Sequence, residues 1–141
     1  MTKRTRPYEG RLLFVDEMLS PSYTLIMRIV FGFKAKTIPG EFGKAAQDVD
    51  FILKLGKMSS KPILFGCDVK MSRRNVEIDA LRTTKLTYVM ATQYFVHRTF
   101  EDQVWRILQY WPKIMDEADK DPDRIFRVDF FSGKIDCKPY L

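Results

Sequence analysis

The sequence predicts an α+β domain: a mostly antiparallel sheet of about six strands with three helices packed largely on one face. Three observations predict it. Short apolar segments alternate with a period of two, longer segments carry apolar residues at helical spacing, and turn signals rich in Gly and Pro separate them. A chain of 141 residues has the size of one domain. We therefore expect a flexible basic arm over residues 1–8 and a single α+β domain over residues 9–141.

The N-terminal half is predicted to hold three strands and one helix. An apolar block within residues 11–19 predicts the first strand. Residues 25–35 fit both an alternating strand and a helical stripe, and we favour the strand because Gly32 would weaken a helix. Residues 41–55 carry an apolar face at helical spacing, which is typical of a surface helix. Residues 62–71 alternate again and predict another strand.

The next part of the chain is predicted to hold a short strand and two helices. Residues 76–81 follow a turn signal and favour a short strand. Residues 84–98 are apolar nearly all round, which favours a buried helix, although their β-branched residues also suit a strand. Thr99 begins a capping-box sequence that opens a long amphipathic helix. Pro112 lacks a backbone N–H, so we expect a kink or break near it.

The C-terminal residues predict a hairpin and a pair of facing carboxylates. Residues 125–131 and 134–138 flank Ser132-Gly133, which is a signal for a two-residue turn. Such a turn places Asp129 opposite Asp136, where like charges are unfavourable unless something offsets them. A divalent cation or a shared proton would do so. Neutralisation by neighbouring lysine and arginine side chains in solvent is the alternative.

Composition excludes several classes of protein. No apolar run reaches the ~20 residues of a membrane span, and the N-terminus does not resemble a secretory signal. Cys67 and Cys137 are too few and too far apart for a disulfide framework or a zinc site, so we expect reduced thiols and an intracellular, cytoplasmic location. No phosphate-cradling glycine loop or nucleophile elbow is present, so we predict no cofactor.

The positive charge is unevenly distributed along the chain. Residues 1–100 hold 17 Lys/Arg against 9 Asp/Glu, whereas residues 101–123 hold 3 against 7. A surplus of cations on one side of the fold would attract a polyanion. The leading hypothesis is therefore a non-enzymatic binding module for nucleic acid, without strong sequence specificity, or for an acidic protein surface. The candidate contact residues are Lys3, Arg4, Arg6, Arg28, Lys34, Lys36, Arg73, Arg74, Arg82 and Lys85.

The hypothesis ranked third is a metal-dependent phosphodiesterase or nuclease. Asp68 and Lys70 are two residues apart near the end of a predicted strand, so their side chains share one face. In metal-dependent nucleases, such a pair binds a cation and stabilises a phosphate. The site needs a further acid from a neighbouring strand, and Asp16 would supply it if the first strand lies alongside. Because the tripeptide is common, a solvated ion pair is the alternative.

The close alternative to nucleic-acid binding, ranked second, is a protein–protein device, such as an inhibitor, an adaptor or an assembly subunit. Trp105 falls off the main apolar stripe of its predicted helix, so we expect it to be exposed at a protein interface. The helix belongs to the acidic part of the chain, whereas the preceding residues are basic. This charge layout is also compatible with a homodimer.

Overall fold

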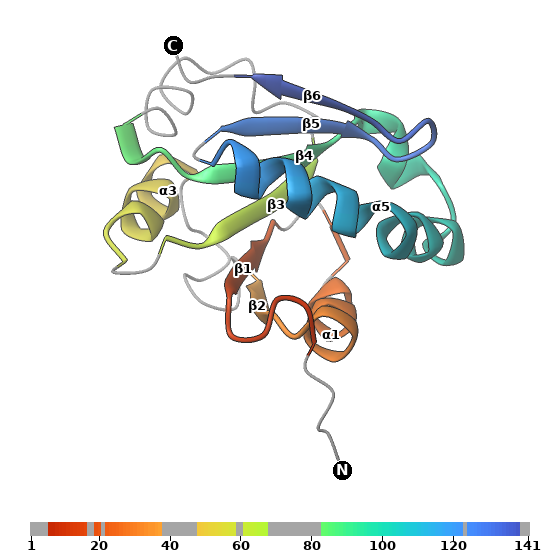
Figure 1. The fold of residues 1–141 in the computed structure, drawn as a ribbon, viewed down its shortest axis with the longest axis horizontal. Coiled ribbons are helices and arrows are strands. Elements are labelled where there is room, and N and C mark those ends of the chain that lie inside the picture. The colour runs from red at the N-terminus through yellow and green to blue at the C-terminus, as the bar shows by residue number, and fades with distance from the viewer. Residues whose placement is uncertain are drawn as a thin grey trace.

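The structure, a computed structural model, describes residues 6–16, 19–20, 22–37, 48–58, 61–67, 83–122 and 124–138. These residues form one six-stranded sheet with helices packed on it (Figure 1). The strand order is β2-β1-β3-β4-β5-β6. The strands are β1 (Leu12–Val15), β2 (Lys34–Thr37), β3 (Ile63–Cys67), β4 (Thr87–Ala91), β5 (Ile125–Asp129) and β6 (Lys134–Lys138).

The direction of the strands corrects the predicted sheet. The strands β1 to β5 pair in parallel, and only β6 is antiparallel, to β5. The prediction of about six strands is confirmed, but the prediction of a mostly antiparallel sheet is wrong. The physical reason is visible in β3, whose five residues are all buried. Strands buried on both faces are typical of parallel sheets, because helical connections cover them.

The segment predicted as a strand over residues 25–35 is helical in its first part. It forms α1 (Tyr23–Ile26) and a π-helical turn, η1 (Met27–Phe31), before β2 begins. Tyr23, Met27 and Phe31 are buried, so the side chains that pack recur every four residues. Gly32 ends the helix in the left-handed conformation, with φ of 85°. Tyr8 packs beside this turn, because its backbone N–H donates to the Phe31 carbonyl at 2.8 Å.

Three further segments connect and flank the central strands. The helix α3 (Asp48–Gly56) confirms the later part of the helix predicted over residues 41–55; residues 38–47 lie outside the described residues. The prediction of a buried helix over residues 84–98 is wrong. This segment forms β4 and a 3₁₀ helix, η3 (Gln93–His97), consistent with its β-branched and aromatic content. The strand predicted over residues 76–81 also lies outside the described residues.

The longest helix, α5 (Phe100–Lys120), begins where the sequence predicts. The Thr99 side chain accepts a hydrogen bond from the Asp102 backbone N–H at 3.2 Å. This contact is the expected N-terminal cap. The helix continues through Pro112 instead of breaking there.

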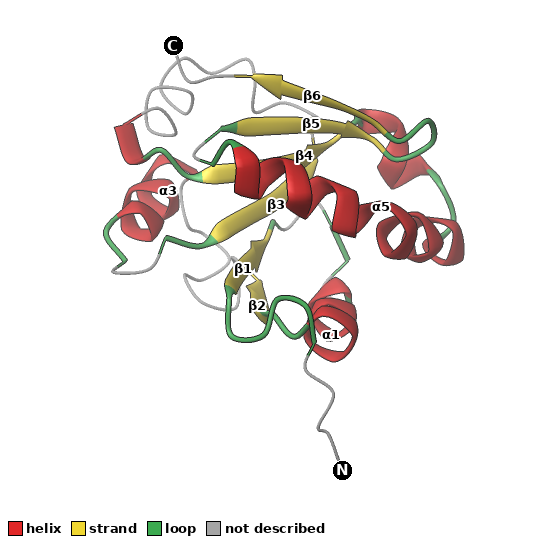
Figure 2. Ribbon diagram, in the orientation of Figure 1, coloured by secondary structure: helices red, strands yellow, loops and turns green. Residues whose placement is uncertain are grey.

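The two faces of the sheet carry different helices. We call them the α5 face, where α1, η1 and α5 pack, and the α3 face (Figures 1 and 2). On the α5 face, Met27 and Trp111 pack against strand residues such as Phe65. On the α3 face, Ile52 packs with Phe14 and other strand residues. Burial on both faces fixes which residues of each strand point to which side.

Candidate functional site at the carboxyl edge of the sheet

The five parallel strands end at one edge of the sheet, which we call the carboxyl edge. The chain runs from β1 to β2 on one side of β1, and it returns to β3 on the other side. In open α/β sheets, ligands bind outside the carboxyl ends of the strands, where the strand order reverses in this way. The topology therefore indicates the ends of β1 and β3 as the expected place for a ligand.

Asp16 lies at this position. It directly follows β1, and its backbone N–H donates to the Phe65 carbonyl of β3 at 2.9 Å. Only 7% of the residue is exposed. Phe14 belongs to the α3 face, and the alternation of a strand places Asp16 on the same face. Burial of an ionisable carboxyl group at the end of a strand is uncommon, and such groups are often part of functional sites.

Gly66 leaves a narrow space beside this carboxylate. A Cβ built at Gly66 would lie 3.3 Å from the Asp16 Cβ and 2.6 Å from the Tyr88 hydroxyl oxygen. Asp16 and Tyr88 therefore approach each other across the bare glycine backbone. The sequence hypotheses missed both Gly66 and Tyr88, although a glycine inside a buried strand signals a close approach.

Neighbouring strands contribute further polar groups to the same edge. Lys36 of β2 pairs with Phe14, so it shares the α3 face with Asp16, and it is exposed. Thr92 directly follows β4 and is partly exposed. Its carbonyl accepts a hydrogen bond from the Cys67 thiol at 3.5 Å, which ties the end of β4 to the end of β3.

The other two residues of the phosphodiesterase hypothesis, Asp68 and Lys70, lie outside the described residues. Asp68 is bonded to Cys67, the last residue of β3. The hypothesis required the first strand to lie alongside this one, and β1 does pair with β3 in parallel. Among the described residues, no three His, Cys, Asp or Glu side chains are placed to hold a metal ion.

The predicted metal pair at the hairpin is not formed. Asp129 stands opposite Lys134, and Asp136 stands opposite Arg127. The loop spans residues 130–133 and is two residues longer than predicted. The cause is the Asp129 carboxylate, which accepts a hydrogen bond from the Phe131 backbone N–H at 2.8 Å and shapes a wider turn.

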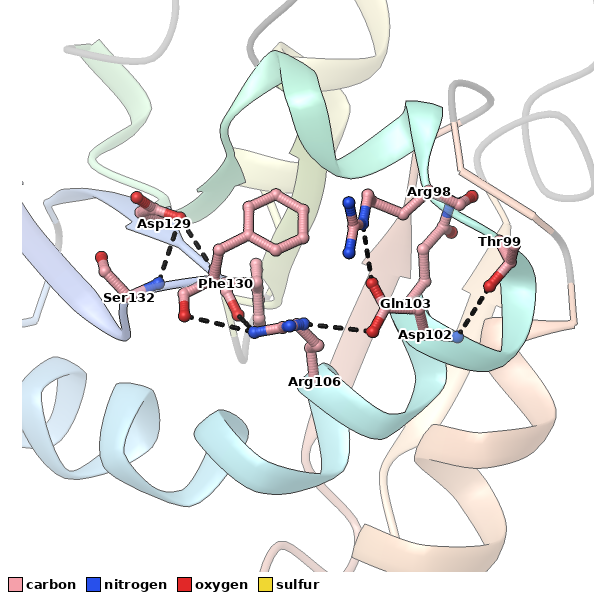
Figure 3. A network of polar contacts seen from close by, with 9 residues as sticks. Arg98, Thr99, Asp102, Gln103, Arg106, Asp129, Phe130 and Ser132 are labelled. Atoms are coloured by element: carbon pink, nitrogen blue, oxygen red, sulfur yellow. Dashed lines mark hydrogen bonds and ion pairs between the residues drawn. The ribbon is translucent and has the colours of Figure 1, made fainter.

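A polar network joins this hairpin to the start of α5 (Figure 3). The Arg106 guanidinium donates to the Phe130 and Phe131 carbonyls, each at 3.2 Å, and lies 4.8 Å from the centre of the Phe131 ring. Asp102 accepts from Arg98 at 2.9 Å and from Arg106 at 3.3 Å. These contacts, that from Arg98 first, lower the pKa of the Asp102 carboxyl. In this network two arginine side chains balance the charge of Asp102, and Asp129 accepts a hydrogen bond from the backbone.

We predict that Asp129→Asn makes the domain less stable at neutral pH by about 1 kcal/mol. The Phe131 backbone N–H, which donates to the carboxylate, lowers the pKa of Asp129. A lowered pKa stabilises the fold above the pKa of the unfolded chain, and this contribution is lost as pH falls through the folded value. Urea unfolding at several pH values should therefore show the difference between parent and variant shrinking below about pH 4. A difference independent of pH would contradict this account.

The ten basic residues of the nucleic-acid hypothesis are only partly described. Lys3, Arg4, Arg73, Arg74 and Arg82 lie outside the described residues. Of the other five, four surround β2. Arg6 donates to the Arg28 carbonyl at 3.0 Å, Arg28 donates to the Ala35 carbonyl, and Lys34 and Lys36 are exposed on β2 itself. Lys85 precedes β4, which is separated from β2 by the strands β1 and β3. Nucleic-acid binding stays a prediction.

The exposure predicted for Trp105 is confirmed. The side chain is 59% exposed, and it lines a shallow, open apolar groove of about 730 Å³, whose described lining lies on α5 alone. The groove is lined by Phe100, Glu101, Val104, Trp105, Leu108 and Gln109. The sequence indicated only the tryptophan, although Phe100, Val104 and Leu108 follow at intervals of four and share its side of the helix.

Comparison of the chain with protein-family models, with curated protein sequences and with solved structures found no match. The assignment of function therefore depends on the geometry of the site. Among the described helices, none combines the length and the apolar character required to cross a membrane.

Proposed function

We propose that this domain binds a divalent cation together with a phosphate-bearing ligand at the carboxyl edge of its sheet. The observation that carries the proposal is the buried carboxylate of Asp16, held beside β3 where the strand order reverses. Asp68 directly follows β3 in sequence and Asp16 directly follows β1, and these two strands pair in parallel. Carboxylate oxygens are the ligands that Mg²⁺ and Mn²⁺ prefer.

In the proposed site, each charged group has a distinct role. Asp16 and Asp68 provide oxygen ligands to the cation, and the cation neutralises charge on the phosphate. Lys70 and Lys36 supply positive charge to the remaining phosphate oxygens. Gly66 places no side chain between Asp16 and Tyr88, whose atoms lie close to its backbone. A buried Asp16 carboxylate that only contacts other groups of the protein is the alternative, and it predicts no selective uptake of metal.

The test is a calorimetric titration of the full chain with MnCl₂. We expect Asp16→Asn and Asp68→Asn each to weaken Mn²⁺ binding at least ~10-fold, because each removes a charged ligand. Asp116→Asn, which removes the same charge from an exposed position on α5, is the matched control and should bind like the parent. Equal affinity in the parent and in Asp16→Asn would refute the proposal.

Two further measurements locate the metal and define the chemistry. Paramagnetic broadening by Mn²⁺ should be strongest in the amide signals of Gly66 and Thr92, next to the ends of β3 and β4. Lys70→Ala should weaken binding of inorganic phosphate in the presence of Mg²⁺ without changing Mn²⁺ affinity. If Mg²⁺ also supports cleavage of DNA, and Asp68→Asn abolishes it, the site is that of a phosphodiesterase.

A further inference from the structure

We propose that two copies of this chain form a symmetric dimer, in which the helical ridge of α1 and η1 enters the α5 groove of the partner. The ridge consists of Leu25, Ile29 and Val30. The groove is the one lined by Phe100, Val104, Trp105 and Leu108 with Glu101 and Gln109. This inference is independent of the metal site, because Asp16 lies on the α3 face and both helices cover the α5 face.

The ridge has the form of a ligand for a groove of this kind. Leu25 is 54% exposed and Ile29 is 68% exposed, and they are four residues apart on one side of the α1–η1 segment. An amphipathic helix binds an apolar groove through side chains at this spacing. The buried residues Tyr23, Met27 and Phe31 hold the opposite side of the segment against the core, so Leu25 and Ile29 point outward.

The ridge and the groove are placed for reciprocal contact. Both belong to helices on the α5 face, and the Tyr23 ring of α1 stacks on the Phe100 ring of α5 with centroids 5.5 Å apart. A ridge beside a groove on one surface is self-complementary about a two-fold axis. The ridge of each copy then occupies the groove of the other, as in an isologous dimer.

Charge and area both favour a second copy over a single docked helix. Arg28 is exposed on the ridge, where it also donates to the Ala35 carbonyl, and it gives the ridge a positive charge. Glu101 gives the groove a negative charge, so the two surfaces have opposite sign. One helix in one groove buries a small area, whereas a stable interface needs about 1,200–2,000 Å² in total. Two reciprocal contacts double the area and bring exposed large apolar side chains of both copies into one interface.

The first measurement is sedimentation of the full chain over a range of concentrations. We expect a monomer–dimer equilibrium, and we expect Ile29→Glu and Trp105→Glu each to raise the dissociation constant at least ~10-fold, since buried tryptophans dominate interfaces. Leu53→Glu is the matched control, because Leu53 is an exposed leucine, 38% accessible, on α3 at the other face. It should leave the dimer unchanged.

A cross-linking experiment tests the pairing itself. In a Cys137→Ser background, where the remaining Cys67 is buried, one sample carries Ile29→Cys and a second carries Leu108→Cys. Mild oxidation of the mixture should give more disulfide-linked dimer than oxidation of either sample by itself. Only the mixture brings the two different introduced cysteines together. A chain that stays monomeric at every concentration overturns the proposal. So does a dimer that Leu53→Glu disrupts and Trp105→Glu does not, and so does cross-linking that shows no preference for the mixed pair.

Discussion

Replacing Trp111 by alanine should lower the free energy of unfolding by about 3–5 kcal/mol. The Trp111 side chain is fully buried on α5 between the Phe33 and Phe65 rings, whose centroids lie 6.1 Å and 5.0 Å from its own. Truncation removes the apolar contacts and leaves a cavity between the helix and the sheet. Because a small domain is stable by only about 5–15 kcal/mol, this loss is a large share of the total.

Two further variants separate packing from other causes. The Trp111 indole N–H is buried and has no hydrogen-bond partner among the described residues. Trp111→Phe removes this unsatisfied donor while keeping a ring, so it should cost much less than alanine. Trp105→Ala, the same substitution at an exposed position of the same helix, should change the stability of the monomer by less than about 1 kcal/mol, when measured at concentrations too low for dimers. Urea unfolding followed by far-UV circular dichroism gives all three values. Equal losses at Trp105 and Trp111 would show that helix formation, not core packing, determines the effect.

The sequence predicted the features of this fold that depend on local chemistry. The cap at Thr99 and the exposure of Trp105 follow from residues a few positions apart, and both are confirmed. The start of α5 needs no knowledge of the rest of the molecule. The same helix also tolerates Pro112, because contacts of its buried face with the sheet hold the segment helical.

Strand direction and register depend on contacts between distant segments. The predictions that depended on such contacts were wrong. Alternation over residues 25–35 matched a strand, but burial of Tyr23, Met27 and Phe31 against the sheet selects the helix. In the hairpin, the Ser132-Gly133 signal predicted a short turn. One hydrogen bond from the Phe131 N–H to the Asp129 carboxylate accompanies the longer loop, and the pairing of every residue in β6 shifts with it.

In the candidate metal site, too, the sequence indicated the residue types but not which strands are neighbours. The residue types of Asp16, Asp68 and Lys70 suggested phosphate chemistry, but their spacing could not show that β1 and β3 are neighbours. The parallel pairing of these strands meets that condition for Asp16. Lys36 was predicted as part of a basic surface, which stays a prediction, and its register opposite Phe14 also places it near the same edge.

Gly66→Ala should lower the free energy of unfolding by about 2 kcal/mol, which is the usual cost of overpacking a filled core. The added Cβ would lie 2.6 Å from the Tyr88 hydroxyl oxygen, closer than nonbonded atoms approach, and 3.3 Å from both the Asp16 Cβ and the Tyr88 Cζ. Tyr88 is almost fully buried on the central strand β4, so its ring has little room to withdraw. Because Asp16 is one of the crowded neighbours, the same substitution should also weaken Mn²⁺ binding at the proposed site.

The double variant Gly66→Ala, Tyr88→Phe identifies the cause. Removing the hydroxyl leaves the ring carbon at 3.3 Å as the closest atom, a separation that a shift of a few tenths of an ångström relieves. Tyr88→Phe alone has a cost of its own, so the informative quantity is the coupling energy from the complete double-mutant cycle. We expect the two losses to be less than additive by at least about 1 kcal/mol in urea unfolding. Additive losses would mean that the alanine is accommodated without touching Tyr88, and Gly66 would then have no special part in shaping the surroundings of Asp16.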